Sequence, residues 1–458
     1  MTREGTQSQK WPIILFTIGV FMAGLDNGII STALTTIYES FNVSPAWGAW
    51  SITLYTLGIA ISVPIIGKLS DNYGRKRLFI IEVALFGIGS LLVALSPNFT
   101  FLLIARFIQA IGGGGIFIIG SSHVLATLPK DKQGKALGLL GSMHGLSAVL
   151  GPNIGAVILH VTDSWHWLFL INIPIALLLI AFGIVKIEET KAPTGKRLDM
   201  VGSLLLSVSI LTFMLGMTRL ADASLTDLVT ISLIGLSIVF AALFLFYEKS
   251  LERSGGDPII AYTMLRSRLF QTTVALGLLS GGFLAGIIYI PSFVQHVLGV
   301  AVSSAGFWLT PLALSSGIGA GLGGFLTDRF GARRTVIAAG IIGAIGFFAF
   351  KFFVTNLLIF TLASIVAGLG LGILLGAPLN VLVGESASDN GKGAALGTLS
   401  LSRQIGLTVF PTIYASFLTV AQTTSAGYDK MFLTSGGASL IVIILGVYLL
   451  MKEKRKRL

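Results

Sequence analysis

Two short segments decide how this sequence is interpreted: GKLSDNYGRKR at residues 67–77 and GFLTDRFGARR at residues 324–334. Both fit the pattern G-x-L-[ST]-D-x-[YF]-G-x-[KR]-R, and the second begins 257 residues after the first. A second pair of similar segments follows at nearly the same offset, GKALGLLGSMHGLSAVLGP at 134–152 and GAALGTLSLSRQIGLTVFP at 393–411. Two duplicated segments in register indicate an internal repeat that spans more than half of the chain.

Long apolar runs flank these motifs. The chain has 458 residues, of which 54% are hydrophobic and only 11% are charged, and its mean hydropathy is +0.88. A soluble domain has about 25% charged residues, so much of this apolar surface must face lipid. Most of the runs are about 20 residues long, which is the length of a helix that crosses a bilayer. We therefore predict an all-α polytopic membrane protein.

We predict about fourteen transmembrane spans. They are expected near residues 11–35, 48–68, 78–96, 99–122, 136–160, 166–186, 199–218, 226–247, 270–293, 304–326, 334–352, 356–380, 394–419 and 431–451. The repeat divides them into an N-terminal six-helix half at 1–190, two inserted helices at 191–255, and a C-terminal six-helix half at 256–458. Parallel duplication of this kind is a transporter architecture, with the substrate site between the halves.

The formal net charge of +11 does not indicate nucleic-acid binding, because the basic residues gather in alternate short loops. This distribution is the positive-inside pattern, and it places both termini in the cytoplasm of a cell whose inner membrane holds the protein. Arg219, Lys351 and Lys430 are exceptions near the other side. The absence of cysteine excludes disulfides and thiolate metal sites. The histidines show no metal-ligand spacing, so we expect neither a metal nor an organic cofactor.

Four segments carry a resemblance to a known family: residues 67–77, ARFIQAIGGGG at 105–115, SAVLGPNIGAVI at 147–158 and GLDNGIISTAL at 24–34. They resemble the loop 2–3, span-four, span-five and span-one signatures of the fourteen-span drug:proton antiporter branch of the major facilitator superfamily. The resemblance covers nearly the whole chain. One departure is Ala156, where the family often has a second glycine. Another is the lack of acidic residues at mid-depth in spans nine to fourteen, where some multidrug members carry them.

The resemblance implies a secondary antiporter that exports amphipathic drugs or other small toxic molecules by alternating access. The energy source would be the proton gradient. The expected partners are protons, small amphipathic substrates and the lipid bilayer, with no nucleic acid, and we expect a monomer. A proton-coupled transporter of an endogenous metabolite or lipid-like solute remains the alternative. A membrane enzyme or scaffold is a third hypothesis, although the sequence shows no catalytic cluster.

Asp26 is the strongest candidate for proton coupling, because a carboxylate inside hydrocarbon costs several kcal/mol and is usually functional. It lies about 15 residues, or ~22 Å, into span one, and Arg106 lies about 8 residues, or ~12 Å, into span four from the opposite side. The two residues should therefore lie at similar depth and pair or compete. A static ion pair that only locks the two spans together is the alternative interpretation.

The repeat supports this assignment. Asp26 and Arg106 correspond to Phe283 and Ser364 in the second half, so neither charge is duplicated. Scaffold roles tend to persist in both copies of a repeat, which places proton coupling in the first half. Glu82, about one turn inside span three, is a further candidate, or it accepts hydrogen bonds near the loop motif.

The loop motif has a mechanical interpretation as a conformational gate. Its glycines permit a tight turn, its aspartate can accept hydrogen bonds from helix N-terminal amides or an arginine, and its arginines can pair with acids. The alternative is a topology signal alone. The candidate gate residues are Gly67, Asp71, Gly74, Arg75, Arg77, Asp328, Arg333 and Arg334.

Proline and glycine in spans five and thirteen predict kinks. Their functional interpretation is a hinge or seal that favours antiport, and ordinary helix packing is the alternative. The hinge candidates are Gly151, Pro152, Gly155 and Pro411.

His144 and Arg403 occupy matching positions of the repeat on spans five and thirteen. If these spans line a central cavity, the two side chains form a cationic wall that tolerates anionic or zwitterionic groups. Alternatively, Arg403 binds a carbonyl and His144 is a neutral helix contact. The full set of candidate cavity residues is Tyr55, Gln109, His144, Tyr289, Trp308, Asn380, Arg403 and Gln404.

Overall fold

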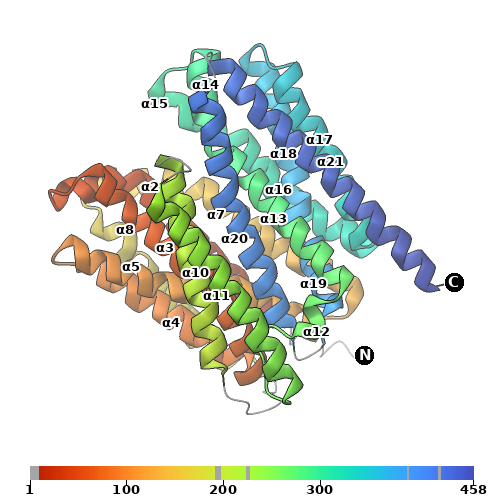
Figure 1. Cartoon of the computed structure of the whole chain (residues 1–458). Coiled ribbons are helices and arrows are strands. Elements are labelled where there is room, and N and C mark those ends of the chain that lie inside the picture. The colour runs from red at the N-terminus through yellow and green to blue at the C-terminus, as the bar shows by residue number, and fades with distance from the viewer. Residues whose placement is uncertain (1–9, 191–197, 223–226, 389–390, 421–423, 458) are drawn as a thin grey trace. The chain divides into compact units, whose positions relative to one another are not determined.

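The computed structural model describes residues 10–190, 198–222, 227–388, 391–420 and 424–457. Every regular element in these ranges is a helix, as Figure 1 shows, which confirms the predicted fold class. The predicted boundary between the N-terminal half and the inserted helices falls between residues 190 and 191, and residue 191 lies outside the described residues. The helices are α2 (Lys10–Ser40), α3 (Pro45–Tyr73), α4 (Arg75–Ala94), α5 (Phe99–Gly114), α6 (Ile116–Thr127), α7 (Lys130–Thr162), α8 (His166–Leu170), α9 (Asn172–Lys186), α10 (Met200–Asp222), α11 (Leu228–Arg253), α12 (Tyr262–Leu265), α13 (Arg268–Ile288), α14 (Ile290–Leu298), α15 (Val302–Ala305), the 3-10 helix η1 (Gly306–Leu309), α16 (Thr310–Phe330), α17 (Ala332–Phe352), α18 (Leu357–Gly376), α19 (Pro378–Ser386), α20 (Lys392–Val420) and α21 (Thr424–Arg457).

The helices form two compact units. The first contains Met1–Leu128, Met143–Asp199 and Ser388–Gly397, and the second contains Pro129–Ser142, Met200–Ala387 and Thr398–Leu458. In the first unit α4 packs against α5 and α9, and in the second α16 and α17 pack against α18. Each unit also contains the first turns of one helix, α7 or α20, whose remainder belongs to the other unit. The predicted six-helix halves remain a prediction.

Twelve helical segments in the described residues are long and apolar enough to cross a membrane, and a bent pair within α7 makes thirteen. They correspond to thirteen of the fourteen predicted spans. The remaining span, predicted at 394–419, forms the 29-residue helix α20, which does not belong to this apolar set. Fourteen crossings therefore stay a prediction.

Several spans predicted as single helices are broken, including the sixth at Ile171 and the ninth at Tyr289, and two further breaks occur in equivalent spans of the repeat. The fourth span consists of α5 and α6, which meet at Gly115, the last residue of a run of four glycines. The twelfth span consists of α18 and α19, which meet at Ala377, with Pro378 as the first residue of α19. A proline at this position lacks only an amide that would be free in any case, so it starts a helix well. The repeat makes these two spans counterparts, so the break is duplicated.

The predicted kink in the fifth span is present. Helix α7 bends by 42° between Lys130–Ser147 and Leu150–Thr162. Pro152 lies just after this bend, and a proline ring clashes with the carbonyl four residues before it. Helix α20 also contains an internal proline, Pro411, within one continuous helix.

The two loop motifs fold as single-residue turns. Gly74 alone separates α3 from α4, with φ of 96°, and Gly331 alone separates α16 from α17, with φ of 86°. Side chains rarely adopt this backbone region, whereas glycine enters it at no steric cost. The glycine that repeats at this position of the motif is therefore required by the turn itself.

Two of the basic residues that break the positive-inside pattern are paired with acids. Nε of Arg219 lies 2.9 Å from Oδ2 of Asp227, and Nζ of Lys351 lies 2.5 Å from Oδ2 of Asp429. Asp227 also caps α11 by accepting from Thr230. The hydrogen bonds from Arg219 and Thr230 lower the pKa of Asp227 to about 2. The positive charge of each of these two residues is therefore neutralised by a nearby acid.

The turn at Gly331 can be tested without packing effects, because a Cβ there would have no neighbour within 4 Å. Gly331→Ala should destabilise the purified protein by about 1–3 kcal/mol, since alanine must adopt a positive φ with an extended ψ of 151°, a region essentially restricted to glycine. Gly306→Ala is the matched control, because Gly306 has equally open space and a helical φ of −63°. Equal unfolding free energies for the two variants would contradict this account.

Candidate functional site

The centre of the first unit holds a buried ion pair. Asp26 extends from α2 and Arg106 from α5, and Nη1 of Arg106 lies 2.5 Å from Oδ2 of Asp26. Both side chains are 0% exposed. The structure therefore brings together the two residues that the sequence predicts at similar depth. A fully buried pair is retained only if its geometry and hydrogen bonds offset the desolvation of both ions.

Gln109, one turn beyond Arg106 on α5, bridges the pair. Its Oε1 accepts from Nη1 of Arg106 at 2.6 Å, and its Nε2 donates to Oδ1 of Asp26 at 2.8 Å. The same Nε2 lies 2.8 Å from Oγ of Ser90 on α4, and Nδ2 of Asn172 at the start of α9 lies 3.3 Å from that hydroxyl. Side chains from α2, α4, α5 and α9 thus form one hydrogen-bonded network around the Asp26 carboxylate.

Aromatic rings cover the guanidinium of Arg106. Its Cζ lies 4.0 Å from the centre of the Tyr55 ring and 5.6 Å from that of Phe169. Nη2 of Arg106 and the hydroxyl of Tyr55 are buried without a hydrogen-bond partner among the described residues. Tyr55 and Gln109, which the sequence suggested as cavity residues, therefore belong to the Asp26 network. Rearrangement or water entry is required before a proton can reach this carboxylate.

Sequence reasoning missed Ser90 and Asn172. Asn172 could have been identified, because it is a polar residue inside the apolar run at 166–186. Ser90 could hardly be identified from the sequence, since serine is common in membrane helices. Only the rotation of α4 about its axis brings its hydroxyl to Gln109.

Glu82 is not part of the Asp26 network. It is 0% exposed on α4, and its Oε2 accepts from the backbone N–H of Gly115 at 3.1 Å. Its Oε1 has no hydrogen-bond partner in the described part of the chain. Glu82 therefore satisfies an amide at the break between α5 and α6. The sequence offered a hydrogen bond near the loop motif as the alternative for Glu82, and the amide that Glu82 binds lies instead in the fourth span.

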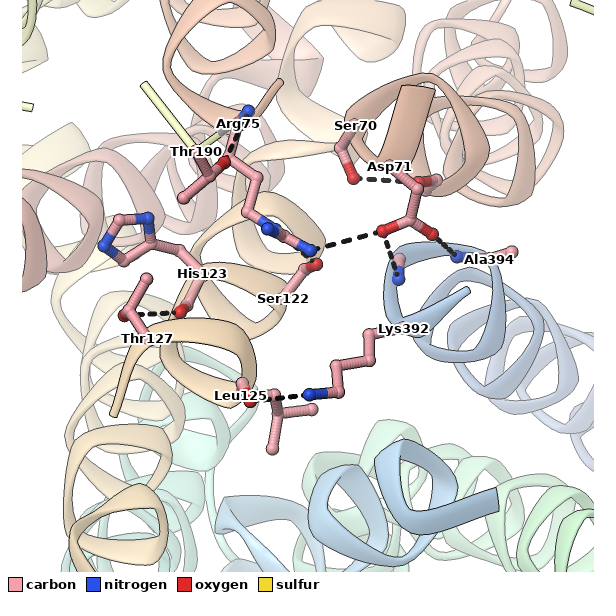
Figure 2. A network of polar contacts seen from close by, with 12 residues as sticks. Ser70, Asp71, Arg75, Ser122, His123, Leu125, Thr127, Thr190, Lys392 and Ala394 are labelled. Carbon is pink, nitrogen blue, oxygen red and sulfur yellow. Dashed lines mark hydrogen bonds and ion pairs between the residues drawn. The ribbon is translucent and has the colours of Figure 1, made fainter. Parts of the chain in front are cut away.

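The carboxylate of the first loop motif caps a helix (Figure 2). Asp71 accepts from the backbone N–H groups of Gly393 and Ala394, each at 3.1 Å, at the beginning of α20. Arg75 lies 3.4 Å from the same carboxylate and donates to Ser122 at 2.8 Å. This arrangement satisfies two of the unpaired amides at a helix N-terminus and places a negative charge at the positive end of its dipole.

Close backbone approach makes this cap possible. A Cβ on Gly67 would collide with the backbone of Gly393, and a Cβ on Gly393 would collide with that of Gly67. Nearby, Nζ of Lys392 donates to the carbonyl of Leu125 at 3.0 Å, near the end of α6. The glycine of the motif thus lets α3 contact the first turn of α20.

The second unit repeats the arrangement. Asp328 accepts from the backbone N–H groups of Gly134 and Lys135, both at 2.7 Å, near the beginning of α7. Asp71 and Asp328 are equivalent in the repeat, and so are the helix starts that they cap. Ion pairs also surround both motifs: Arg77 lies 3.8 Å from Glu189, which follows α9, and Arg333 lies 2.8 Å from Glu385 on α19. Arg334 is exposed.

The hinge candidates Gly151 and Pro152 lie against α2. A Cβ on Gly28 would lie 2.8 Å from Cδ of Pro152, and Gly151 packs on the backbone of Gly28. Gly155 lies against Ile29 on the same helix. The bend in α7 is therefore packed directly against the helix that carries Asp26.

The other predicted cavity residues are divided between the two units, with His144 in the first and the rest in the second. His144 is exposed near the Phe117 ring, and Trp308 packs on the Phe360 ring. The remaining four lie in the second unit: Tyr289 donates to the carbonyl of Pro411 at 2.8 Å, Asn380 donates to the carbonyl of Gly376 at 3.4 Å, Arg403 donates to Ser280 at 3.4 Å, and Gln404 is half-buried.

Comparison with known proteins gives consistent matches. The sequence model of the Major Facilitator Superfamily matches residues 16–290 and 272–458. An uncharacterized MFS-type transporter of Bacillus subtilis strain 168, YfiU, is 63% identical over 431 residues, 93% of this chain and 82% of that protein. Multidrug resistance protein 3 of the same strain is 35% identical over 424 residues, 90% and 80% of the two chains. The solved proton:xylose symporter XylE, bound to 6-bromo-6-deoxy-D-glucose, has the same fold, with a TM-score of 0.68 at 17% identity over 95% of each chain.

The buried pair predicts strong coupling between its two members. Arg106→Gln should lower the free energy of unfolding by about 3–5 kcal/mol, because it leaves the Asp26 carboxylate uncompensated. The double variant Asp26→Asn, Arg106→Gln should be less destabilised than the sum of the two single variants. A denaturation series on the purified proteins measures the cycle. Additive single effects would mean that the two charges do not interact.

Proposed function

Because this chain belongs to the major facilitator superfamily, we propose that it is a proton-coupled antiporter that exports small amphipathic molecules. The family and the fold are those of transporters, and the chain is a multi-pass membrane protein. The positive-inside distribution supports a bacterial cytoplasmic membrane with both termini in the cytoplasm. The name of the multidrug resistance relative supports drugs as substrates.

One observation carries the proposal of proton coupling. Asp26 is fully buried, and its charge is compensated by Arg106 within the same unit. When a proton binds Asp26, the carboxylate loses its charge and the guanidinium of Arg106 is left uncompensated in an apolar environment. That state is costly in the observed geometry. The conformation must therefore change until Arg106 reaches water or another acceptor, which links protonation to helix movement.

Gln109 links the two members of the ion pair during this step. Its amide contacts both members of the pair at once, through its oxygen to Arg106 and through its nitrogen to Asp26. A neutral carboxylic acid can still accept from the amide nitrogen and gains one O–H donor. Gln109 can therefore hold Asp26 in place while Arg106 is released.

The duplicated helix caps provide elements that this movement can make and break. Asp71 and Asp328 each hold the first turn of a helix whose remainder belongs to the other compact unit. Breaking the Asp71 cap leaves two buried amides without partners, so the capped state is preferred until another interaction offsets that cost. The amides held by Asp328 are part-buried and exposed, so that cap costs less to break. We infer that the two caps act as gates in alternating access.

The proposal is tested by reconstituting the wild type and Asp26→Asn in liposomes with an imposed pH gradient. An ethidium dye and a zwitterionic quinolone serve as probes. Asp26→Asn should reduce gradient-driven transport to the level of protein-free liposomes, because its side chain cannot be protonated at physiological pH. Exchange of probe for probe without a gradient should persist, since the binding site is intact.

Glu82→Gln is the matched carboxyl-to-amide control within the same unit. We expect it to retain gradient-driven transport, because Glu82 contacts a backbone amide and no arginine. If Asp26→Asn transports like the wild type while Glu82→Gln does not, the coupling site is Glu82. If the wild type moves neither probe, an endogenous metabolite or lipid-like solute replaces drugs as the substrate class.

A further inference from the structure

Arg403 is a cation at the centre of the second unit. It lies 11 residues after the start of α20, about 16 Å along the helix axis. Its nearest polar contact is Ser280, which occupies the middle of the 21-residue helix α13. Since α13 is long enough to cross the hydrocarbon core, Arg403 lies at mid-depth in the membrane. Ionisable residues at this depth are rare and usually serve function.

The charge of Arg403 has no counterion in the described part of the chain. Its Nε donates to the hydroxyl of Ser280 at 3.4 Å, and that hydroxyl itself donates to the carbonyl of Gly277 at 2.6 Å. Its Nη2 is buried without a hydrogen-bond partner among the described residues. Arg403 is half-buried as a whole, with a neutral oxygen at its Nε and no partner among the described residues at its Nη2.

The ion-paired acids of the second unit bind other cations. They form the pairs Asp227 with Arg219, Glu385 with Arg333, Glu453 with Arg333, and Asp429 with Lys351. All of these pairs lie near helix ends, whereas Ser280 marks the middle of a span. None of these ion-paired acids is therefore placed to neutralise Arg403.

Arg106 provides an internal reference for what a buried arginine requires. In the first unit it has a carboxylate at 2.5 Å, a glutamine oxygen at 2.6 Å and an aromatic ring at 4.0 Å. Arg403 has none of these in the described residues. A guanidinium that is partly removed from water and has no acid beside it is costly. Because Arg403 is half-buried, it also stays accessible to an anion from outside the chain, which would offset that cost.

We propose that Arg403 binds the anionic group of the transported molecule, so that the preferred substrates are amphipathic compounds with a carboxylate. This inference rests on the transport function proposed above and specifies its substrate class. A guanidinium suits this role, because its planar donors match the two oxygens of a carboxylate. A small inorganic anion such as chloride would also neutralise the guanidinium. The experiment therefore distinguishes a substrate carboxylate from an inorganic anion.

The experiment measures binding to the purified full chain in detergent, without a gradient. The probes are ciprofloxacin and fluorescein, each compared with its own methyl ester, which lacks the carboxylate charge. The wild type should bind each acid about tenfold more tightly than the ester and show a higher unfolding temperature with the acid. Arg403→Gln should abolish this preference, and Arg403→Lys should retain part of it.

Two controls separate recognition from folding. Ser280→Ala removes the neutral contact but keeps the charge, so the preference for the acid should remain. Arg403→Gln removes an uncompensated charge, so without ligand its unfolding temperature should equal or exceed that of the wild type. This expectation is opposite to that for Arg106→Gln.

Three results would overturn the proposal. The first is a wild type that binds neither acid more tightly than its ester. The second is an acid preference that survives in Arg403→Gln. The third is an Arg403-dependent rise in unfolding temperature with chloride but not with the acids, which would make the bound anion inorganic. Because the assay contains no pH gradient, any of these results leaves proton coupling through Asp26 intact. Loss of coupling, in turn, would not affect the preference for the acid.

Discussion

A charge inside a membrane needs an opposite charge or a set of hydrogen bonds, because hydrocarbon offers it no water. The first unit meets this requirement with one compact cluster, in which Asp26 and Arg106 are in contact and Gln109 binds both. Five helices contribute to this cluster, because α3 adds the Tyr55 ring and the carbonyl of Ser51 to the side chains from α2, α4, α5 and α9. Their rotations are therefore fixed by polar contacts as well as by the packing of small residues. A change in the charge of one carboxylate consequently acts on all of these helices together.

The internal repeat distinguishes the residues that hold helices together, which occur in both halves, from the central ion pair, which occurs in one. The single-glycine turns at Gly74 and Gly331 and the capping carboxylates Asp71 and Asp328 are present in both halves. The position equivalent to Asp26 is instead a buried phenylalanine, Phe283. Features that hold helices together have been kept in both copies, and the central ion pair occurs in one. This asymmetry gives the two units different electrostatic properties on similar frames.

The sequence was sufficient for the fold class, the family resemblance and the depth at which Asp26 and Arg106 lie. Depth follows from the constant rise of a helix, which needs only a residue count. The contributions of Ser90 and Asn172 depend on the rotation of α4 and α9 about their axes. Rotation is determined by packing over the whole helix and not by any local motif. The breaks at Gly115 and Ala377 were missed for a related reason, since glycine runs in membrane helices also serve close packing.

The buried Arg106 and the half-buried Arg403 give the proposed antiport a simple electrostatic basis. With neither ligand bound, Arg106 is compensated and Arg403 is not. An anionic substrate at Arg403 would leave no uncompensated arginine, whereas a proton on Asp26 would leave two. The substrate-loaded and proton-loaded states therefore differ more from each other than either differs from the empty protein. A conformation that admits water to the arginines favours the proton-loaded state, and one that excludes water favours the substrate-loaded state. Ligands that favour different conformations in this way are expected to exchange, because each shifts the equilibrium away from the form that binds the other.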